Sequence, residues 1–212
     1  MSIVLASVFT AIAGYFLGCF NGAIIISKYI LKDDIRTHGS GNAGMNNFRR
    51  VFGGKLTFAV IACDVLKAMF GMFIGLALFA AADGQVLTGK FIGGIFVLLG
   101  HIFPVMFGFK GGKGILSGGT VALFMDWRVG VTVLALFIVL VAATRFVSLG
   151  SIAAGALFPF ACWYFMGVAY FPFGAALGAL VIFMHRENIG RLLRGEEDKL
   201  SFKKKKPEEA QK

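Results

Sequence analysis

The chain has 212 residues, of which 58% are hydrophobic, including 24 phenylalanines, and its formal net charge is +10. So much apolar sequence excludes an ordinary soluble domain of this length and predicts an all-α integral membrane protein, because apolar runs of about 20 residues cross a bilayer core of roughly 30 Å. In such a protein the positive charge faces anionic headgroups, and no nucleic-acid-binding motif is present, so the expected partners are membrane lipids and not nucleic acid.

Seven apolar segments have the composition of membrane helices. They run from about residues 3 to 27, 56 to 82, 91 to 109, 114 to 125, 129 to 144, 148 to 166 and 171 to 184. We therefore predict a bundle of about seven transmembrane helices. Because the fourth segment is short for a full crossing, five or six crossings also fit the sequence.

Lys and Arg residues are concentrated in alternate connections between these segments. Six lie between residues 27 and 55, three more are Lys110, Lys113 and Arg145, and nine follow residue 185, whereas Lys90 and Arg128 lie in the other connections. The positive-inside rule then predicts an outside amino terminus and a cytoplasmic carboxyl terminus. All the basic connections would share the cytoplasmic side of a multi-pass protein.

Domain organisation follows from the same pattern. Residues 1–195 are expected to form one membrane-embedded domain, and residues 196–212, which have almost no apolar content, a flexible charged cytoplasmic tail. The three cysteines lie in apolar segments without ligand spacing, and no other cluster has the spacing of metal ligands. We therefore expect no metal site and no cofactor.

Residues 39–50, with the sequence GSGNAGMNNFRR, form the first polar cluster. Three glycines in six residues allow successive backbone N–H groups to converge. Side-chain donors surround them at Ser40, Asn42, Asn46, Asn47, Arg49 and Arg50. Such a concentration of donors suits a carboxylate or a phosphate, which the planar fork of arginine matches well. A cytoplasmic loop with ordinary positive-inside charge is the alternative.

Three ionisable residues lie within apolar segments. Asp64 and Lys67 are spaced (i, i+3) on one helix, so they are expected to neutralise each other as a structural pair that supports the site. His101 also lies in an apolar run, where an ionisable side chain lines a cavity or has a partner.

The second polar cluster comprises residues 100–104, GHIFP, and 109–114, FKGGKG. It is not a Walker phosphate loop, because Gly114 follows Lys113 where that motif has Ser or Thr. The backbone N–H groups of Gly111, Gly112 and Gly114 open into the next helix and are expected to face an anion. A plain turn with two snorkelling lysines, Lys110 and Lys113, is the alternative.

Two further polar clusters follow. In residues 145–151, RFVSLGS, Ser148 or Ser151 is expected to cap the next helix. In residues 185–196, HRENIGRLLRGE, His185 and Asn188 stand three residues apart on one helical face, with Arg191 a turn further on. This stripe would orient a polar substrate if it points inward, and would be an interfacial cationic helix if it points outward.

Taken together, the blocks at residues 39–50, 100–104, 109–114, 145–151 and 185–196 resemble the bacterial acyl-phosphate:glycerol-3-phosphate acyltransferase family, PlsY, in order and topology over nearly the whole chain. The resemblance implies an enzyme of the bacterial cytoplasmic membrane with its active site on the cytoplasmic side. Its partners would be glycerol 3-phosphate, acyl phosphate and membrane lipids, and its products lysophosphatidate and inorganic phosphate.

The resemblance also implies the residues of the site. Ser40, Asn42 and Arg50 would bind the phosphate-bearing substrate together with Lys110, Lys113, His185 and Asn188. The full predicted set has Ser40, Arg50, Lys113 and His185 as catalytic residues; Gly39, Asn42, Gly44, Asn47, Lys110, Gly111, Gly112, Gly114, Ser148, Ser151 and Asn188 as substrate-binding residues; and Asp64, Lys67 and His101 as supporting residues. The chain departs from the family pattern at Met45-Asn46, at Ala68 and at residues 115–117.

The predicted chemistry requires little more than positioning. An acyl phosphate is already activated, so the protein holds two phosphate-bearing molecules together and stabilises the developing oxyanion. The proton of the attacking hydroxyl goes to His185, to His101 or to the departing phosphate, and the sequence does not choose among them. A small membrane transporter of an organic phosphate is the competing function, because a basic cavity suits either purpose.

Overall fold

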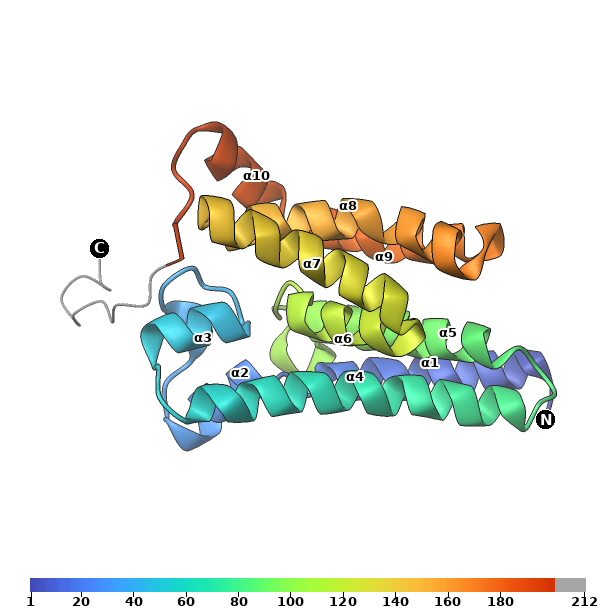
Figure 1. Ribbon diagram of the computed structural model, residues 1–212. Coiled ribbons are helices and arrows are strands. Elements are labelled where there is room, and N and C mark those ends of the chain that lie inside the picture. Colours follow the sequence, from blue (N-terminus) through green and yellow to red (C-terminus); the bar gives the residue numbers. More distant parts are fainter. Residues whose placement is uncertain (201–212) are drawn as a thin grey trace. The chain divides into compact units, whose positions relative to one another are not determined.

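The computed structural model describes residues 1–200, and that part of the chain consists of helices and their connections (Figure 1). Residues 201–212, which include most of the predicted flexible tail, lie outside the described residues. Contacts divide the chain into two compact units, which are described separately: unit 1 is Met1–Gly118, and unit 2 begins at Gly119.

Unit 1 is built on three long helices that pack against one another: α1 (Ile3–Cys19), α4 (Leu56–Ala80) and α5 (Val86–Ile102). Between α1 and α4 the chain forms α2 (Gly22–Ile25), the π-helical turn η1 (Ile26–Ile30), the 3₁₀ turn η2 (Ile35–Thr37) and α3 (Met45–Val51). Another 3₁₀ turn, η3 (Val105–Phe107), follows α5. Figure 1 shows α3 at the end of unit 1 where α4 begins.

Small residues let these three helices touch backbone to backbone. A Cβ atom at Gly75 in α4 would overlap the carbonyl oxygen of Gly89 in α5, and a Cβ atom at Gly100 in α5 would overlap that of Tyr15 in α1. In lipid, where apolar side chains gain little by leaving the solvent, such close backbone contact is a main source of helix association. The glycines therefore fix the register of α5 between α1 and α4.

Unit 2 is built on α7 (Trp127–Thr144), α8 (Val147–Met166) and α9 (Phe171–Met184), with α8 packed against both of the others. The helix α6 (Ile115–Met125) begins in unit 1 and ends in unit 2. A 3₁₀ turn, η4 (Val168–Tyr170), precedes α9, and α10 (Arg186–Leu193) follows it. Arg145 ends α7 with a left-handed backbone, φ 64°, and reverses the chain into α8.

Every apolar segment predicted from the sequence forms a helix, although not all of them are long enough to cross a membrane. Five helical stretches are long and apolar enough: Ile3–Ile30, Leu56–Ala80, Val86–Phe107, Trp127–Thr144 and Val147–Met166. A sixth arises if Val168–Met184 and Arg186–Leu193, which are bent by 57°, count as one broken span. The predicted bundle is thus confirmed as all-helical with five or six candidate spans. The short α6 accounts for the difference between six and seven, and the short α9 of the bent pair for the difference between five and six.

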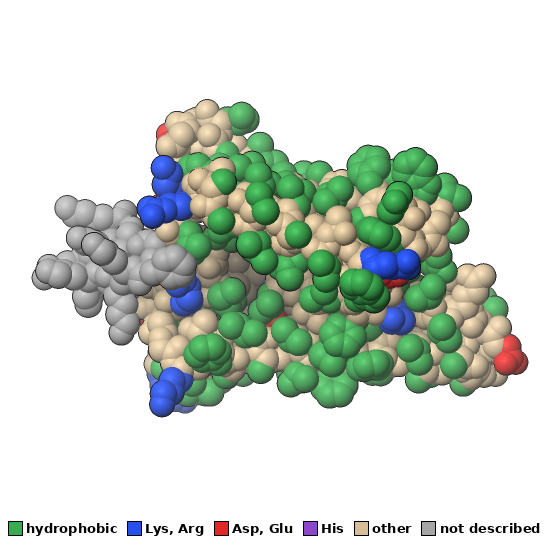
Figure 2. Space-filling model, viewed as in Figure 1, with side chains coloured by type: hydrophobic (Ala, Val, Ile, Leu, Met, Phe, Trp, Pro, Cys, Tyr) green, Lys and Arg blue, Asp and Glu red, His purple; other side chains and the backbone are tan. Residues whose placement is uncertain are grey.

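The outer faces of the long helices carry large apolar side chains. Phe58 and Phe70 on α4 and Val139 on α7 are more than half exposed, as expected where lipid replaces water. On the face seen in Figure 2, hydrophobic side chains cover the flanks of the helices, while Lys and Arg lie near helix ends. This surface is that of an integral membrane protein.

The packing of α4 on α5 gives the first prediction. Gly75→Ala should lower the free energy of unfolding by about 1–3 kcal/mol, because the new methyl group would push against the Gly89 backbone. Gly119→Ala in α6 is the matched control, since nothing in the described chain lies within 4 Å of the added Cβ atom. Thermal unfolding in detergent measures both variants, and equal midpoints would contradict the packing role.

Candidate active site

Asn47 organises the first polar loop of unit 1. Its buried side chain donates from Nδ2 to the carbonyl oxygens of Ile35 (3.3 Å), His38 (3.0 Å) and Asn42 (3.1 Å). Its Oδ1 accepts a hydrogen bond of 3.1 Å from the backbone N–H of Ser40. Asn47 therefore has a structural role, because both ends of its amide bind the loop backbone, and its substrate contact stays a prediction.

Other residues of this loop remain at the surface. Ser40 and Arg50 are exposed, and Asn42 is half-buried. Gly39 and Gly41 have φ of 57° and 67°, a left-handed backbone that glycine adopts without strain. The loop thus presents Ser40 outward from a backbone that Asn47 fixes beneath it.

Arg36 connects the first loop to the second. Its Nε and Nη2 donate to the two carboxylate oxygens of Asp34, at 3.0 and 2.7 Å, and its Nη1 donates to the carbonyl oxygen of Phe107 at 2.7 Å. The hydrogen bond from Arg36 lowers the pKa of the Asp34 carboxyl, against a smaller opposing effect of burial. A second connection is the hydrogen bond of 3.4 Å from Ala43 N–H to the Gly111 carbonyl oxygen.

The glycine–lysine loop departs from its predicted form. The N–H of Gly111 donates to the Ile102 carbonyl oxygen and that of Gly112 donates to the His101 carbonyl oxygen, both at 3.1 Å. These two N–H groups satisfy the carboxyl end of α5, so the prediction that they face an anion is wrong. Gly114, with φ 75°, opens α6, while Lys110 is exposed and Lys113 half-buried on either side of the glycines.

A buried ionic cluster lies behind the second loop. Lys67 Nζ is 2.7 Å from Asp64 Oδ1 and 2.7 Å from His101 Nδ1, and it also donates to the Phe20 carbonyl oxygen at 3.2 Å. Each of the three ionisable side chains is at most 3% exposed. The contact of Lys67 with Asp64 is a buried ion pair. The predicted pairing of Asp64 with Lys67 is confirmed, and His101 joins it.

In unit 2, His185 lies at the bend between α9 and α10. It is 3% exposed, and its Nδ1 is 2.8 Å from the Val181 carbonyl oxygen. Because a carbonyl only accepts, Nδ1 carries the proton and Nε2 is the acceptor nitrogen of the neutral ring. Asn188, 7% exposed, follows one turn later in α10.

The two serines at the start of α8 do not cap it. Phe146 occupies the N-cap position without a side-chain cap. Ser151 Oγ donates to the Val147 carbonyl oxygen of its own helix at 2.8 Å, which is a structural contact. Ser148 is buried, and its hydroxyl faces the Glu197 carboxylate without forming a hydrogen bond of standard geometry.

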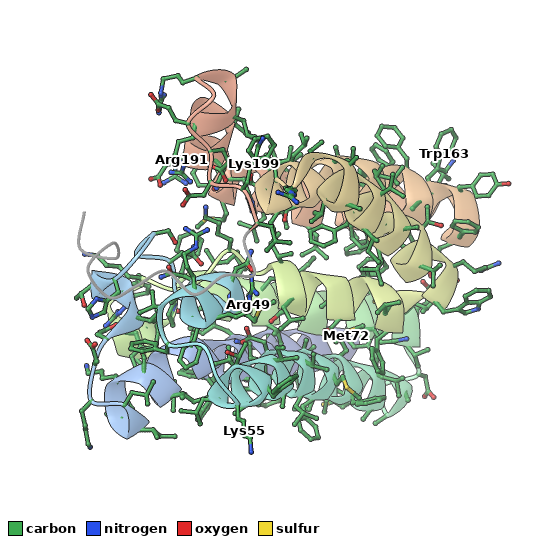
Figure 3. All side chains as sticks on the ribbon, turned by 60° about the vertical axis from the view of Figure 1, so that its left-hand side comes forward. Arg49, Lys55, Met72, Trp163, Arg191 and Lys199 are labelled. Atoms are coloured by element: carbon green, nitrogen blue, oxygen red, sulfur yellow. The ribbon has the colours of Figure 1, made fainter. Side chains whose placement is uncertain are left out.

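Glu197, which the sequence analysis placed in a flexible tail, binds the last polar cluster. Its Oε1 accepts from Asn188 Nδ2 at 2.6 Å and its Oε2 from Arg191 Nε at 2.7 Å. The backbone N–H of Leu200 donates to the Arg145 carbonyl oxygen at 2.7 Å, and Figure 3 shows Arg191 and Lys199 at the same end of unit 2, far from Trp163. Residues 196–200 thus contact the rest of unit 2, and the domain boundary at residue 195 stays a prediction. The sequence signal for these contacts was the acidic run at residues 196–198, which lies inside a basic segment.

Each unit therefore gathers two of the four predicted polar clusters at one end. In unit 1, the hydrogen bond from Ala43 to Gly111 joins the loops at residues 39–50 and 109–114, and Arg36 before the first loop binds the carbonyl oxygen of Phe107 before the second. In unit 2, the clusters at 145–151 and 185–196 are joined through Glu197 and Leu200. The described residues contain no group of three His, Cys, Asp or Glu side chains suited to a metal ion.

Comparison with known proteins adds a second line of evidence. Residues 8–195 match the family described as glycerol-3-phosphate acyltransferase. The chain belongs to this family. The glycerol-3-phosphate acyltransferase of Thermoanaerobacter pseudethanolicus is 41% identical over 198 residues, which cover 93% of this chain and 97% of that protein. The glycerol-3-phosphate acyltransferase of Alkaliphilus metalliredigens is 38% identical over 192 residues, which cover 91% of this chain and 95% of that protein.

Solved structures of the family agree in fold. The glycerol 3-phosphate form of PlsY, an integral membrane glycerol 3-phosphate acyltransferase, matches with a TM-score of 0.82 and 33% identity, covering 92% of this chain and 96% of that one. The lysophosphatidic acid form of PlsY matches with a TM-score of 0.79 and 33% identity, and the match covers 92% of this chain and 95% of that one. The resemblance inferred from the sequence is confirmed, and the chain is a multi-pass membrane acyltransferase.

The contacts of Asn47 give the second prediction. Asn47→Asp should lower the free energy of unfolding by roughly 1–3 kcal/mol or more, because a carboxylate oxygen would replace the amide donor toward three carbonyl oxygens. Acyltransferase activity should fall as well, because Ser40 loses its fixed backbone. Asn46→Asp is the neighbouring control. Thermal unfolding and acyltransferase activity are measured for both variants, and equal effects of the two substitutions would contradict a special role of Asn47.

Glu197 gives a prediction about pH. Burial raises the pKa of its carboxyl, but the hydrogen bonds of Asn188 and Arg191 and the Ser148 hydroxyl outweigh burial, so the folded pKa is lowered. A lowered pKa stabilises the fold above the unfolded pKa of about 4.3, and this contribution is lost as the pH falls through the folded pKa. Glu197→Gln should therefore lower the thermal midpoint at pH 7 and match the parent only at an acidic pH below the lowered folded pKa. An equal deficit at both pH values would exclude the charge as the cause.

Proposed function

We propose that this enzyme transfers a fatty acyl group from acyl phosphate to the 1-hydroxyl of glycerol 3-phosphate. The hydroxyl oxygen forms a bond to the acyl carbonyl carbon, the bond from that carbon to the phosphate oxygen breaks, and lysophosphatidate and inorganic phosphate leave. The observation that carries the proposal is the pair of PlsY structures, 33% identical to this chain, in glycerol 3-phosphate and lysophosphatidic acid forms.

The joined loops of unit 1 supply the phosphate-binding groups in this proposal. Arg50 and Lys110 are exposed cations on two loops that Ala43 and Arg36 connect, and Ser40 is an exposed hydroxyl above Asn47. Lys113 contributes a further cation. Two anionic substrates repel each other in water, so fixed cations lower the cost of bringing them together and stabilise the charge that develops at reaction.

Glycines of these loops act differently from one another. Gly39 provides the turn that places Ser40, and Gly44 begins α3. Gly111 and Gly112 use their N–H groups to end α5, so in this proposal they permit close packing and do not bind substrate. Asn42 and the backbone N–H of Gly114 remain proposed substrate contacts.

Unit 2 carries the residues that the sequence predicts as proton acceptor and polar contacts. The hydrogen bond of His185 to Val181 leaves Nε2 as the nitrogen that takes a proton from the attacking hydroxyl. Asn188 and Ser148 are proposed to contact the glycerol portion, since amide and hydroxyl groups suit hydroxyl recognition. His101 is not a proton acceptor in this scheme, because Lys67 donates to its Nδ1 and the neutral ring then carries its proton on Nε2.

The site is proposed to lie on the cytoplasmic side of a bacterial cytoplasmic membrane. The polar ends of both units lie among the connections that carry most of the Lys and Arg residues. The amino terminus would then be outside and the carboxyl terminus cytoplasmic. The transporter alternative has no observation in its favour once the family is known.

The proposal is tested with purified enzyme in detergent by following phosphate release and lysophosphatidate together. Acyl phosphate plus glycerol 3-phosphate should give the two products in equal amounts, whereas acyl coenzyme A or acyl carrier protein in place of acyl phosphate should give none. Lysophosphatidate made from acyl coenzyme A without phosphate release would overturn the choice of donor.

Variants test the residues in the same assay. Arg50→Ala should lower kcat/KM by about 10²-fold through loss of a phosphate contact, while Lys55→Ala, which removes another exposed cation of unit 1, should leave it unchanged. His185→Gln should lower kcat by about 10²–10⁴-fold with little change in KM. Folded variants with parental turnover would remove these residues from the site.

A further inference from the structure

The buried cluster of Asp64, Lys67 and His101 is not needed for contact with substrate in the scheme above. It nevertheless places an ammonium, a carboxylate and an imidazole, each at most 3% exposed, within helices that are long and apolar enough to cross a membrane. Ionisable groups at such depth are costly and persist when they pair with one another. A purely apolar cluster would hold the helices together at lower cost, so the cluster calls for a second role.

Lys67 fixes the orientation of the His101 ring. An ammonium only donates, so His101 Nδ1, 2.7 Å away, accepts and the proton of a neutral ring lies on Nε2. Asp64 Oδ1 lies 2.7 Å from the same ammonium and 3.5 Å from Nδ1, so the three groups contact one another. The Phe20 carbonyl oxygen, at the end of α1, is a further acceptor for Lys67. The ring is thus held by groups from α1 and α4 although it belongs to α5.

The opposite edge of the ring lies directly against the glycine–lysine loop. A Cβ atom at Gly112 would overlap His101 Nε2 and would stand 2.7 Å from the carbonyl oxygen of Ala43. The backbone N–H of Gly112 in turn donates to the His101 carbonyl oxygen. His101 therefore contacts the loop through both its side chain and its main chain.

Contacts continue from this point to the first loop. The carbonyl oxygen of Gly111 accepts from Ala43 N–H, and the Ala43 carbonyl oxygen accepts from Asn21 Nδ2 at 3.0 Å. Ser117 Oγ in α6 donates to the Asp64 carbonyl oxygen at 3.1 Å, beyond Lys113 in the chain. The cluster thus lies beneath the backbone that carries Lys110 and Lys113 and also touches the segment that leads to α6.

We propose that His101, oriented by Lys67 and Asp64, is a positioning residue that fixes the Gly111–Gly112 backbone and so sets the positions of Lys110 and Lys113. The inference rests on the proposed function, in which these lysines bind phosphate. Two cations on a loop that moves would bind a small phosphorylated substrate less tightly. Their alignment should therefore appear in the KM for glycerol 3-phosphate more than in kcat.

The main test removes the charges together. Lys67→Met alone leaves Asp64 buried without its partner, whereas Asp64→Asn with Lys67→Met replaces the ion pair by neutral groups of similar volume and should preserve the fold. This double variant should raise the KM for glycerol 3-phosphate by about tenfold and leave kcat within about threefold of the parent. Thr10→Val is the matched control, because it removes a buried hydroxyl of unit 1 that has no hydrogen-bond partner among the described residues.

A second variant separates the two contacts of the ring. His101→Asn retains an acceptor near the Nδ1 position for Lys67 but removes the edge that lies against Gly112. It should show the same rise in KM with a parental thermal midpoint. Hydrogen exchange followed by mass spectrometry should show faster exchange in residues 109–114 for both variants and unchanged exchange in the second half of α4.

The outcomes separate this inference from the proposed function. If Lys110→Ala and Lys113→Ala raise the KM but the folded double variant and His101→Asn do not, the positioning role is wrong. If neither lysine variant changes the KM, the phosphate-binding role fails and the inference fails with it. If the double variant does not fold, His101→Asn decides alone, and a parental KM with parental exchange in residues 109–114 overturns the proposal.

Discussion

Backbone polar groups within the membrane must be paired inside the protein, and this constraint shapes the polar loops of both units. Water does not reach a buried N–H or carbonyl in the hydrocarbon region, so loops that enter or border it are held by their own side chains. Asn47 meets four backbone groups of one loop, and Glu197 meets the amide and guanidinium of α10. The polar residues of this enzyme thus divide between those that build the loops and those that the loops present.

This division explains why a loop rich in glycine need not bind anions with its backbone. Gly111 and Gly112 look like a phosphate loop in the sequence, but their N–H groups complete the carboxyl end of α5. Glycine is required there because His101 and Ala43 leave no space for a side chain at Gly112. The lysines on either side carry the charge, and the glycines let that charge lie close to the helix bundle.

The sequence was sufficient for the helices, the family and the Asp64–Lys67 pair, because these depend on hydropathy, motif order and (i, i+3) spacing. It was not sufficient for the roles of individual polar residues. Asn42 and Asn47 have the same side chain in the same loop, and only the fold shows that Asn47 is buried beneath it. The Glu197 contacts were missed since a charged segment resembles a solvated tail until its partners on α10 are known.

Residues 196–200 extend the contacts of unit 2 beyond its last helix. A chain shortened after Gly195 would keep every helix, yet the Asn188 amide and the Arg191 guanidinium would lose their shared carboxylate, and Arg145 its bond from Leu200. Truncation at the end of α10 should therefore loosen the last polar cluster. The hydrogen bonds made by the segment after α10 belong to unit 2 as much as its helices do.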